Sequence, residues 1–339
     1  MLRVTVPRSG APSVMVLRES PDPEPGVGEV RIRVEAAGVC FADLMIRMGL
    51  YPEAPPFPVV PGYEVAGVID AVGEGVAASR VGTPVVALTL FGGYATHVVV
   101  PDGHALSRPP GLDAVTAAAM PVNGLTAWML TQQVFRVRAG DRVLVPSAGG
   151  GVGLAVLDLV RWKGGVSIGL ASPSKHAFLL ERGFARVVDR SAEDWVGLAQ
   201  ADGLFDLVLD SVGGHSVSES FELVAGGGML VCYGYQAVAA SHKRKLWPAL
   251  KTMVELPWLR FNPLALANTN RAVAGVNMLK LATDATQVRA WMTELLALWA
   301  GGIFRPYVHA SVPFSRAAEA HMLLHDRKNI GKVVLVPDP

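Results

Sequence analysis

A glycine-rich stretch in the middle of the chain constrains the fold more than any other part of the sequence. Residues 143–160 read VLVPSAGGGVGLAVLDLV, which runs from an apolar strand through a cluster of small residues into an amphipathic helix. Small residues let the backbone approach a pyrophosphate, and the free N–H groups at the helix start face its negative charge. We therefore expect a dinucleotide-binding turn, against the simpler alternative of a glycine-rich turn without a ligand. The residues of this loop that we expect to contact the cofactor are Ala148, Gly150, Gly151, Val152 and Gly153.

The succession of strands and helices divides the chain into two kinds of region. The first third contains short β-branched runs separated by Gly and Pro, which predicts a compact all-β unit. Residues 142–233 alternate between apolar strands and helical stretches, which predicts a parallel sheet with helices on both faces. Ligands of such sheets lie at the carboxyl ends of the strands, so Tyr233 and Gly234, which follow a strand, are expected to line the cofactor groove.

The strand after the glycine loop indicates which dinucleotide is bound. NAD sites usually end this strand with an acidic residue that binds the ribose 2′-hydroxyl. Residues 169–178 read GLASPSKHAF, with Ser172, Ser174 and Lys175 but no acid, and Arg190 follows the next strand. Hydroxyls and cations suit a 2′-phosphate, so NADPH is favoured and NADH stays open. The alternative for the two cations is that they are ordinary solvated residues.

Composition narrows the class of protein. A chain of 339 residues predicts two domains, and 51% hydrophobic residues provide a core for each. The formal net charge of +1 gives no sign of a nucleic-acid-binding surface. The N-terminus shows no apolar signal region, and no window of about 18 residues is apolar and uncharged. We therefore expect a soluble cytoplasmic protein whose two cysteines are reduced, with no transmembrane segment.

Longer stretches resemble the medium-chain dehydrogenase/reductase superfamily, in its zinc-independent quinone oxidoreductase branch and particularly its VAT-1-like group. The similar stretches follow the family's order along nearly the whole chain: AAGVCFADLMIRMGLYP, PGYEVAGVIDAVGEGV, VNGLTAWMLT, SAGGGVG, ASPSKH, DLVLDSVGG, CYGY and NIGKVVLVP. The resemblance implies an α/β fold with a GroES-like β-barrel catalytic domain, residues 1–119 completed by 267–339. It further implies a Rossmann domain with a doubly wound parallel sheet, residues 120–266, an active site in the cleft between the domains, and a homodimer.

Cys40 decides between the zinc-dependent and the zinc-independent branch of this superfamily. In the zinc-dependent branch a cysteine at this position is followed by a His-Glu pair, which here reads Tyr63-Glu64. The second cysteine, Cys232, lies in the Rossmann region. Catalytic zinc needs about three protein ligands, so we expect no zinc and assign Cys40 to the lining of the substrate pocket. Quinone reductases resemble GLNFAD here, with Asn in place of Cys40, and a thiol is a weaker hydrogen-bond donor.

The expected reaction follows from the absence of a metal. Without a Lewis acid the hydride acceptor must already be electrophilic. We expect NAD(P)H-dependent reduction of the C=C bond of an α,β-unsaturated carbonyl, for example an enoyl-CoA thioester, by hydride transfer to the β-carbon. Two alternatives stay open: a quinone oxidoreductase, and a VAT-1-like cofactor-binding protein with little turnover.

The resemblance also assigns individual residues to the site. Tyr51 matches a tyrosine of enoyl-thioester reductases and is the candidate proton donor, with a packing role at the loop exit as the alternative. Asn123 and Thr126 match positions near the nicotinamide. Lys332 matches a basic residue near the cleft, with a solvated strand end as the alternative, and Asp43 matches a structural acid that ties a loop to backbone amides.

The segment 242–266 is the least typical part of the chain. It reads HKRKLWPALKTMVELPWLRFNPLAL and combines a basic cluster with two tryptophans and a phenylalanine. Three interpretations are open: a lid or acyl-chain tunnel whose cations meet the phosphates of coenzyme A, a helix at a membrane surface, or an extended helix and loop at a dimer contact.

Overall fold

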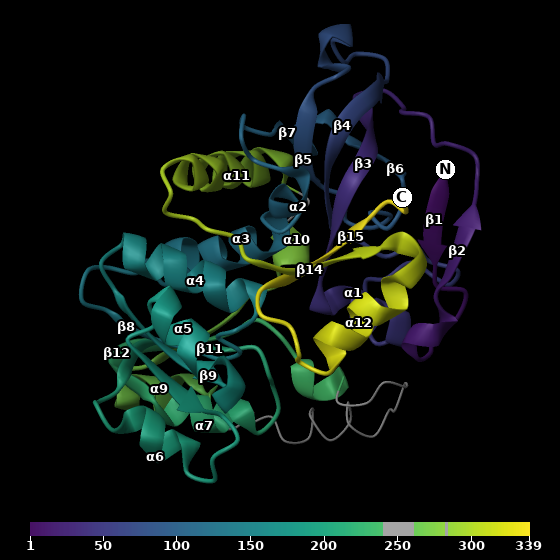
Figure 1. Ribbon diagram of the computed structural model, residues 1–339. Coiled ribbons are helices and arrows are strands. Elements are labelled where there is room, and N and C mark those ends of the chain that lie inside the picture. The colour runs from purple at the N-terminus through teal and green to yellow at the C-terminus, as the bar shows by residue number, and fades with distance from the viewer. Residues whose placement is uncertain (240–260, 282–283) are drawn as a thin grey trace. The chain divides into compact units, whose positions relative to one another are not determined.

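The computed structural model describes residues 1–239, 261–281 and 284–339, and these form two compact units (Figure 1). Unit 1 consists of residues 1–125, 279–281 and 284–339, and unit 2 of residues 126–239 and 261–278. The domain limits expected from the sequence, at 119 and 266, stay a prediction. Most of the basic segment 242–266 lies outside the described residues, and so does the choice among its three interpretations.

Unit 2 is built around a six-stranded sheet in which every pairing is parallel, as the alternation of strands and helices predicts. The strand order is β10-β9-β8-β11-β12-β13, so the chain builds one half outward from β8 and then returns to build the other half. This reversal places the topological switch point between β8 and β11, where open α/β sheets bind ligands. The strands are β8 (Arg142–Val145), β9 (Val166–Ala171), β10 (Arg186–Asp189), β11 (Phe205–Asp210), β12 (Val224–Cys232) and β13 (Ala272–Gly275).

Helices connect successive strands of this sheet and cover both of its faces. Right-handed crossovers put the helices of the two halves on opposite faces, and Figure 1 shows α4 and α5 on one side of the strands and α6, α7 and α9 on the other. The helices are α4 (Gly151–Trp162), α5 (His176–Arg182), α6 (Trp195–Gln200), α7 (Ser216–Glu222) and α9 (Pro263–Thr269). Their apolar faces join a core that includes Leu144, Val208 and Leu230 from the strands and Trp195 and Phe221 from the helices.

Unit 1 contains the all-β region that the first third of the sequence predicts. Its seven-stranded sheet has the order β14-β15-β3-β4-β5-β7, with β6 paired to β3, and β1 (Leu2–Thr5) and β2 (Val16–Glu19) form a separate ribbon. The C-terminal strand β15 therefore lies between β14 and β3. The strands of the sheet are β3 (Glu29–Val39), β4 (Glu64–Val72), β5 (Pro84–Leu88), β6 (His97–Pro101), β7 (Ala105–Ser107), β14 (Val308–Pro313) and β15 (Lys332–Val336).

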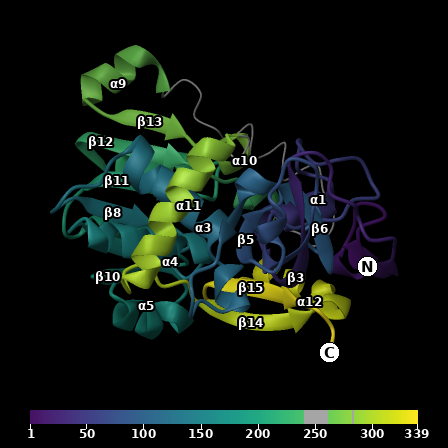
Figure 2. The ribbon, with the colours of Figure 1, turned by 90° about the horizontal axis from the view of Figure 1, so that it is seen from above.

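Short helices accompany this sheet, and one helix connects the units along the chain. This helix, α3 (Pro121–Trp128), begins at a proline, which suits the first turn of a helix. It continues beyond Trp128 as a turn of π-helix, Met129–Val134. The helices are α1 (Phe41–Met48), α2 (Ala114–Ala117), α3 (Pro121–Trp128), α10 (Met278–Leu281), α11 (Ala285–Ala300) and α12 (Ala317–His325). In the view of Figure 2, α12 lies next to β14 and β15, and contacts within unit 1 pack it on both strands.

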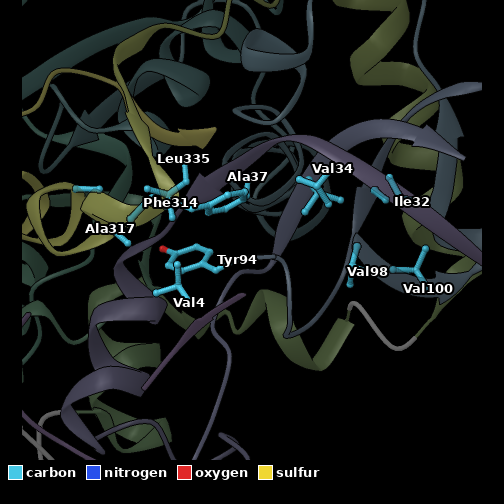
Figure 3. Packing of buried hydrophobic residues seen from close by; sticks show 14 of the residues in the cluster. Val4, Ile32, Val34, Ala37, Tyr94, Val98, Val100, Phe314, Ala317 and Leu335 are labelled. Atoms are coloured by element: carbon cyan, nitrogen blue, oxygen red, sulfur yellow. The ribbon is translucent and has the colours of Figure 1, made fainter. Parts of the chain in front are cut away.

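The core of unit 1 follows the two-residue period of its strands. On β3, Val30, Ile32 and Val34 are buried, whereas the residues between them are at least partly exposed. Figure 3 shows Ile32 and Val34 in one apolar layer with residues of β6 and of the C-terminal region, such as Val98 and Leu335. The C-terminal region thus completes a core that the N-terminal strands begin.

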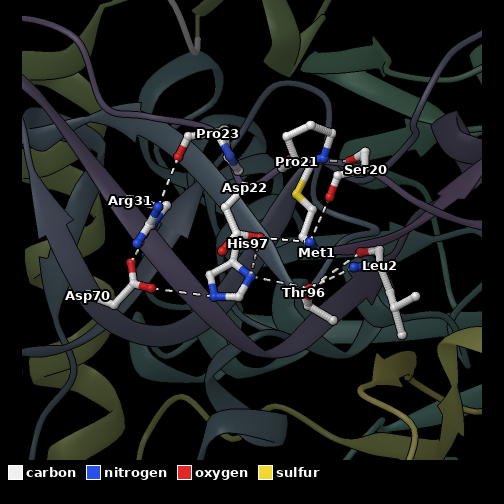
Figure 4. A network of polar contacts seen from close by, with 10 residues as sticks. All are labelled: Met1, Leu2, Ser20, Pro21, Asp22, Pro23, Arg31, Asp70, Thr96 and His97. Atoms are coloured by element: carbon white, nitrogen blue, oxygen red, sulfur yellow. Dashed lines mark hydrogen bonds and ion pairs between the residues drawn. The ribbon is translucent and has the colours of Figure 1, made fainter.

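A chain of charged groups fastens the β1–β2 ribbon to the sheet (Figure 4). The N-terminal ammonium lies 2.7 Å from Asp22, and the Arg31 Nε atom donates to Asp70 at 2.9 Å. His97 lies between the two carboxylates, 3.9 Å from Asp22 and 3.4 Å from Asp70. His97 is therefore part of a network of charged groups.

A second, buried network holds α1 against the sheet. The Asp43 carboxylate accepts hydrogen bonds from the Cys40 and Gly62 N–H groups, both at 2.8 Å, and from the Tyr94 hydroxyl at 3.1 Å. The Tyr94 hydroxyl also lies 3.2 Å from Nε2 of His321 on α12. Burial raises the pKa of Asp43 to about 6, although these donors act in the opposite direction, and burial lowers the pKa of His321 well below its usual range. Asp43 thus ties a loop to backbone amides, as expected from the sequence.

The raised pKa of Asp43 predicts a pH-dependent stability. Its ordinary pKa is 3.8 and its pKa in the fold is about 6, so the folded state favours the protonated carboxyl. The contribution of Asp43 to the free energy of unfolding is therefore full below pH 3.8 and falls by about 3 kcal/mol as the pH rises to about 6. We expect the difference in free energy of unfolding between wild type and Asp43→Asn, measured with urea, to change by this amount across that window.

A direct measurement on the wild type accompanies this comparison, because the variant also loses hydrogen bonds. In a ¹³C-carboxyl NMR titration, one aspartate signal should titrate near pH 6 and vanish in the variant. A wild-type spectrum in which every aspartate titrates near the ordinary pKa, together with a pH-independent stability difference, would contradict the prediction.

Candidate functional site

The glycine loop of unit 2 has the close-packed geometry that a phosphate-binding turn needs. Ser147 adopts φ +50° directly after β8, and the Gly150 N–H donates back to its carbonyl at 2.8 Å, so the chain turns sharply into α4. A Cβ atom at Gly153 would lie 2.7 Å from the Ala148 carbonyl oxygen, which only glycine avoids. Ala148 itself is fully buried and donates from its N–H to the Leu170 carbonyl. Position 148 of the loop therefore accepts alanine, because its side chain points into the core.

The start of α4 supplies the donors of this turn. The helix begins at Gly151 with Gly150 as its N-cap, and the cap uses no side chain. The first N–H groups of any helix lack intrahelical acceptors, so those of Gly151, Val152 and Gly153 remain for an anion. The predicted loop residues are thus brought together at one helix start, and a pyrophosphate fits their chemistry.

Hydroxyls and an ammonium gather at the carboxyl end of β9. The Ser172 and Ser174 hydroxyls lie 3.3 Å apart in the turn between β9 and α5. A Cβ atom at Gly149 would lie 2.8 Å from Cδ of Lys175, so the lysine side chain extends across the glycine loop. Lys175 therefore lies beside the loop predicted to bind the pyrophosphate, in the same turn as Ser172 and Ser174.

Arg190 has three close contacts of its own. Its N–H donates to the Ala171 carbonyl at 3.3 Å, which places its backbone at the end of β9. Its guanidinium lies 3.2 Å from the Glu219 carboxylate and 4.0 Å from the centre of the Trp195 ring. A 2′-phosphate would have to compete with Glu219 for this cation, so its role in the cofactor site stays a prediction.

Further polar groups meet at the ends of β8, β11 and β12. Gln236 donates to the Ser211 hydroxyl at 3.1 Å and accepts from the Ser147 hydroxyl at 3.4 Å. A Cβ atom at Gly234 would lie 2.8 Å from the Ser211 carbonyl, so Gly234 allows the ends of β11 and β12 to approach closely. Burial raises the pKa of the neighbouring Tyr233 to about 12. Sequence analysis did not find Ser147, Ser211 and Gln236, because single polar residues after strands form no recognisable motif.

In unit 1, the strand registers bring Cys40, Glu64 and Lys332 together. Val333 of β15 pairs with Val39 of β3, which sets Lys332 beside Cys40, and Ala37 of β3 pairs with Val65 of β4, which sets Gly38 beside Glu64. A Cβ atom at Gly38 would lie 2.4 Å from a Glu64 carboxylate oxygen. The missing side chain of Gly38 thus leaves room for this carboxylate.

The resulting cluster is a buried ion pair with a thiol. The Lys332 ammonium is paired with the Glu64 carboxylate and donates to the Cys40 sulfur at 3.1 Å. The thiol donates to Glu64 at 3.3 Å, and all three residues are at most 6% exposed. Burial raises the pKa of Cys40 well above its usual range, although Lys332 opposes this. Burial alone would lower the pKa of Lys332, but Cys40 and Glu64 more than offset this and raise it. Lys332 is therefore an internal counter-ion and not a solvated strand end.

Glu64 connects this cluster to the start of α3. Its second carboxylate oxygen accepts a hydrogen bond from the Val122 N–H at 2.7 Å, which satisfies a donor of the first helical turn. The neighbouring Asn123 donates to the Ala119 carbonyl at 3.3 Å, and Thr126, one turn further, is buried. The sequence signal that could have indicated this cluster is the presence of charged residues, Glu64 and Lys332, in apolar strands, because buried charged residues are rare unless they are paired.

Tyr51 lies at the end of the loop that leaves α1. Gly49 ends this helix in the left-handed conformation, with φ +67°, and the Leu50 N–H donates to the Met45 carbonyl at 2.9 Å. The Tyr51 ring meets the Tyr63 ring edge to face, with centroids 6.3 Å apart, and Tyr63 contacts Phe91 at 5.3 Å. Burial raises the pKa of Tyr51, and the Tyr63 hydroxyl acts in the opposite direction. Tyr51 and Cys40 pack into one apolar cluster with Tyr63.

The residues around Cys40 do not fit a catalytic zinc ion. Zinc would need about three ligands with an open fourth position, but an ammonium group already lies beside the Cys40 sulfur and Glu64. The residue directly before Glu64 is Tyr63, whose side chain is an uncharged phenol. Across residues 1–239, 261–281 and 284–339, no three His, Cys, Asp or Glu side chains are grouped to hold a metal.

Comparison with known families matches both parts of the chain. Residues 26–110 match the family described as alcohol dehydrogenase GroES-like domain, and residues 182–335 match the family described as zinc-binding dehydrogenase. These matches confirm the expected fold, a GroES-like N-terminal domain with a Rossmann-like sheet. In the described part of the chain, no helix is both long and apolar enough to cross a bilayer.

Relatives of the whole chain place it more narrowly. The synaptic vesicle membrane protein VAT-1 homolog of Rattus norvegicus is 38% identical over 95% of this chain and 80% of its own length. A quinone oxidoreductase of Pseudomonas aeruginosa is 32% identical over 99% of both chains. Among solved structures, the quinone oxidoreductase of Escherichia coli complexed with NADPH superposes with a TM-score of 0.86 at 25% identity, covering 99% of this chain and 100% of its own. The chain belongs to the medium-chain dehydrogenase/reductase superfamily, in the branch of quinone oxidoreductases and VAT-1 homologues, and is an NAD(P)H-dependent oxidoreductase of that branch.

Proposed function

We propose that this protein reduces quinones with NADPH and uses no catalytic metal. The observation that carries the cofactor choice is the carboxyl end of β9, where one turn holds two serine hydroxyls and a lysine whose side chain lies against the glycine loop. A 2′-phosphate is an acceptor for such donors, whereas the ribose hydroxyl of NADH is usually met by an acid. The similarity to quinone oxidoreductases, one of them solved with NADPH, supports the same choice.

The proposed chemistry needs one hydride and one proton for each acceptor. NADPH, when bound, supplies the hydride, and the protein positions and polarises the acceptor. Tyr51 is the proposed proton donor, since its phenol is half-buried, with a raised pKa, and so stays protonated at neutral pH. Its O–H bond breaks as the negative charge that develops on the acceptor oxygen is neutralised, and solvent then restores the proton. Cys40 is proposed to shape the pocket wall, because its raised pKa keeps the thiol neutral and weakly nucleophilic.

A second candidate substrate is an α,β-unsaturated carbonyl, including an enoyl thioester. The same phenol would then protonate the α-carbon after hydride transfer to the β-carbon, so Tyr51 favours this candidate as well. A third candidate, a VAT-1-like protein that binds the cofactor with little turnover, is supported by the similarity to VAT-1 homologues. The homodimer and the cytoplasmic location expected from the sequence remain proposals.

One assay separates these candidates. Oxidation of NADPH and of NADH is followed by nicotinamide absorbance with quinones, simple enones and short enoyl-CoA thioesters in parallel. Turnover of quinones supports the proposed function, and selective turnover of an enoyl thioester replaces it with the second candidate. Saturable NADPH binding without turnover of any acceptor supports the third.

Lys175→Ala should weaken NADPH binding specifically. The variant loses the ammonium beside the glycine loop, so we expect the Kd for NADPH to rise about tenfold and the Kd for NADH to stay within about twofold. Nucleotide titration of protein fluorescence measures both constants. Lys163→Ala is the matched control, because that ammonium lies over the Trp162 ring at 3.5 Å and should leave both constants unchanged. Equal losses for both nucleotides would argue against a 2′-phosphate site at Lys175.

Tyr51→Phe should remove the proposed proton donor while retaining the ring packing. We expect kcat to fall by about 100-fold with the Kd for NADPH unchanged. Tyr307→Phe is the control, since this tyrosine is 41% exposed and is assigned no role in the reaction. Stopped-flow rates of NADPH oxidation and thermal unfolding of each variant separate chemistry from folding. A Tyr51→Phe enzyme with wild-type kcat would leave the family assignment intact and refute the proton donor.

A further inference from the structure

Tyr63 lies directly behind Tyr51 and restrains its ring. The two rings meet edge to face at an interplanar angle of 65°, and Phe91 packs against Tyr63 with centroids 5.3 Å apart. Tyr63 is 2% exposed, whereas Tyr51 is only half-buried. Aromatic pairs of this geometry contribute about 0.5–1.5 kcal/mol beyond their buried area. The partly exposed phenol thus stands on a fixed aromatic support.

The Tyr63 hydroxyl is a buried hydrogen-bond donor. Its oxygen is buried and forms no hydrogen bond of ordinary geometry with residues 1–239, 261–281 or 284–339, although the Tyr51 hydroxyl lies near enough for each phenol to affect the pKa of the other. The Tyr63 carbonyl, by contrast, accepts a hydrogen bond from the Thr89 N–H at 2.9 Å. Leaving a buried hydroxyl without a partner costs about 1–3 kcal/mol. Such a group in a native core needs an explanation beyond packing.

The charges around the pair decide which phenol loses its proton. Burial and the Asp43 carboxylate raise the pKa of Tyr63 far above its usual range, so it remains a donor. Burial, Glu53, Asp43 and Cys40 raise the pKa of Tyr51, but the Tyr63 hydroxyl acts against them. A negative charge in this pair therefore forms on Tyr51, and the Tyr63 hydroxyl favours it.

We propose that Tyr63 is a positioning residue for Tyr51, whose ring fixes the Tyr51 ring and whose hydroxyl donates to the Tyr51 oxygen once that oxygen has given up its proton. This rests on the proposed function of Tyr51 as proton donor. The proton balance is closed: the Tyr51 O–H bond breaks, the reduced acceptor gains that proton, Tyr63 keeps its own, and solvent reprotonates Tyr51. A donor placed beforehand stabilises the developing charge without reorganisation.

Tyr63→Phe separates this role from packing, because it retains the ring and removes only the hydroxyl. The protein is labelled with fluorotyrosine, and its six tyrosines give ¹⁹F signals that single Tyr→Phe variants assign. We expect the pKa of Tyr51 to rise in Tyr63→Phe and kcat for quinone reduction to fall about tenfold, with KM for the quinone within about twofold. Tyr94→Phe is the matched control: it removes a buried hydroxyl bonded to Asp43 and should lower the Tm without raising the pKa of Tyr51.

A second readout needs no change at Tyr63. In the wild type, the Tyr63 fluorine signal should shift as Tyr51 ionises, and this response should disappear in Tyr51→Phe. An unchanged pKa of Tyr51 in Tyr63→Phe, or a Tyr63 signal that ignores the ionisation of Tyr51, would overturn the proposal.

Different results would refute the proposed function and the role of Tyr63. If the wild type reduces quinones but Tyr63→Phe changes neither the pKa of Tyr51 nor kcat, the proposed function stands and the role of Tyr63 is wrong. If no acceptor is reduced while Tyr63→Phe raises the pKa of Tyr51, the coupling of the two phenols stands and the proposed function is wrong.

Discussion

The buried pairing of Lys332 with Glu64 is the interaction on which unit 1 most depends. It joins the C-terminal strand β15 to β4, and through the second oxygen of Glu64 it also holds the first turn of α3. Removing one member of a buried ion pair leaves an uncompensated charge, which usually costs about 3–5 kcal/mol. The pairing therefore fixes how the last strand of the chain docks between β14 and β3.

The same cluster engages the polar atoms around Cys40. The Cys40 sulfur receives a hydrogen bond from an ammonium, and the thiol in turn donates to the carboxylate that the ammonium neutralises. The three side chains satisfy one another and leave no open coordination position. The proposed proton donor of unit 1, Tyr51, has a half-buried phenol at the end of the α1 loop, close to a second phenol.

Unit 2 contributes to function through backbone geometry more than through reactive side chains. Its glycine loop turns sharply at Ser147, and glycine at position 153 lets α4 start against the loop backbone. The helix start supplies donors that are already oriented, so binding an anion there requires little reorganisation. In the proposed function, the side chains at the end of β9 select the dinucleotide. There Lys175 crosses the loop, while Arg190 is engaged by Glu219 and Trp195.

The sequence by itself determined the parallel sheet, the glycine loop and the family, because these depend on local patterns and on motifs in a fixed order. It also identified Tyr51, Lys175, Ser172 and Ser174 as candidate site residues. It did not show that Lys332, Cys40 and Glu64 form one cluster, since their contact depends on the registers of β15 with β3 and of β3 with β4. Likewise, only the tertiary structure placed Tyr63 behind Tyr51 and Glu219 against Arg190. Contacts between residues far apart in the chain are decided by strand register and core packing, which no local pattern in one sequence encodes.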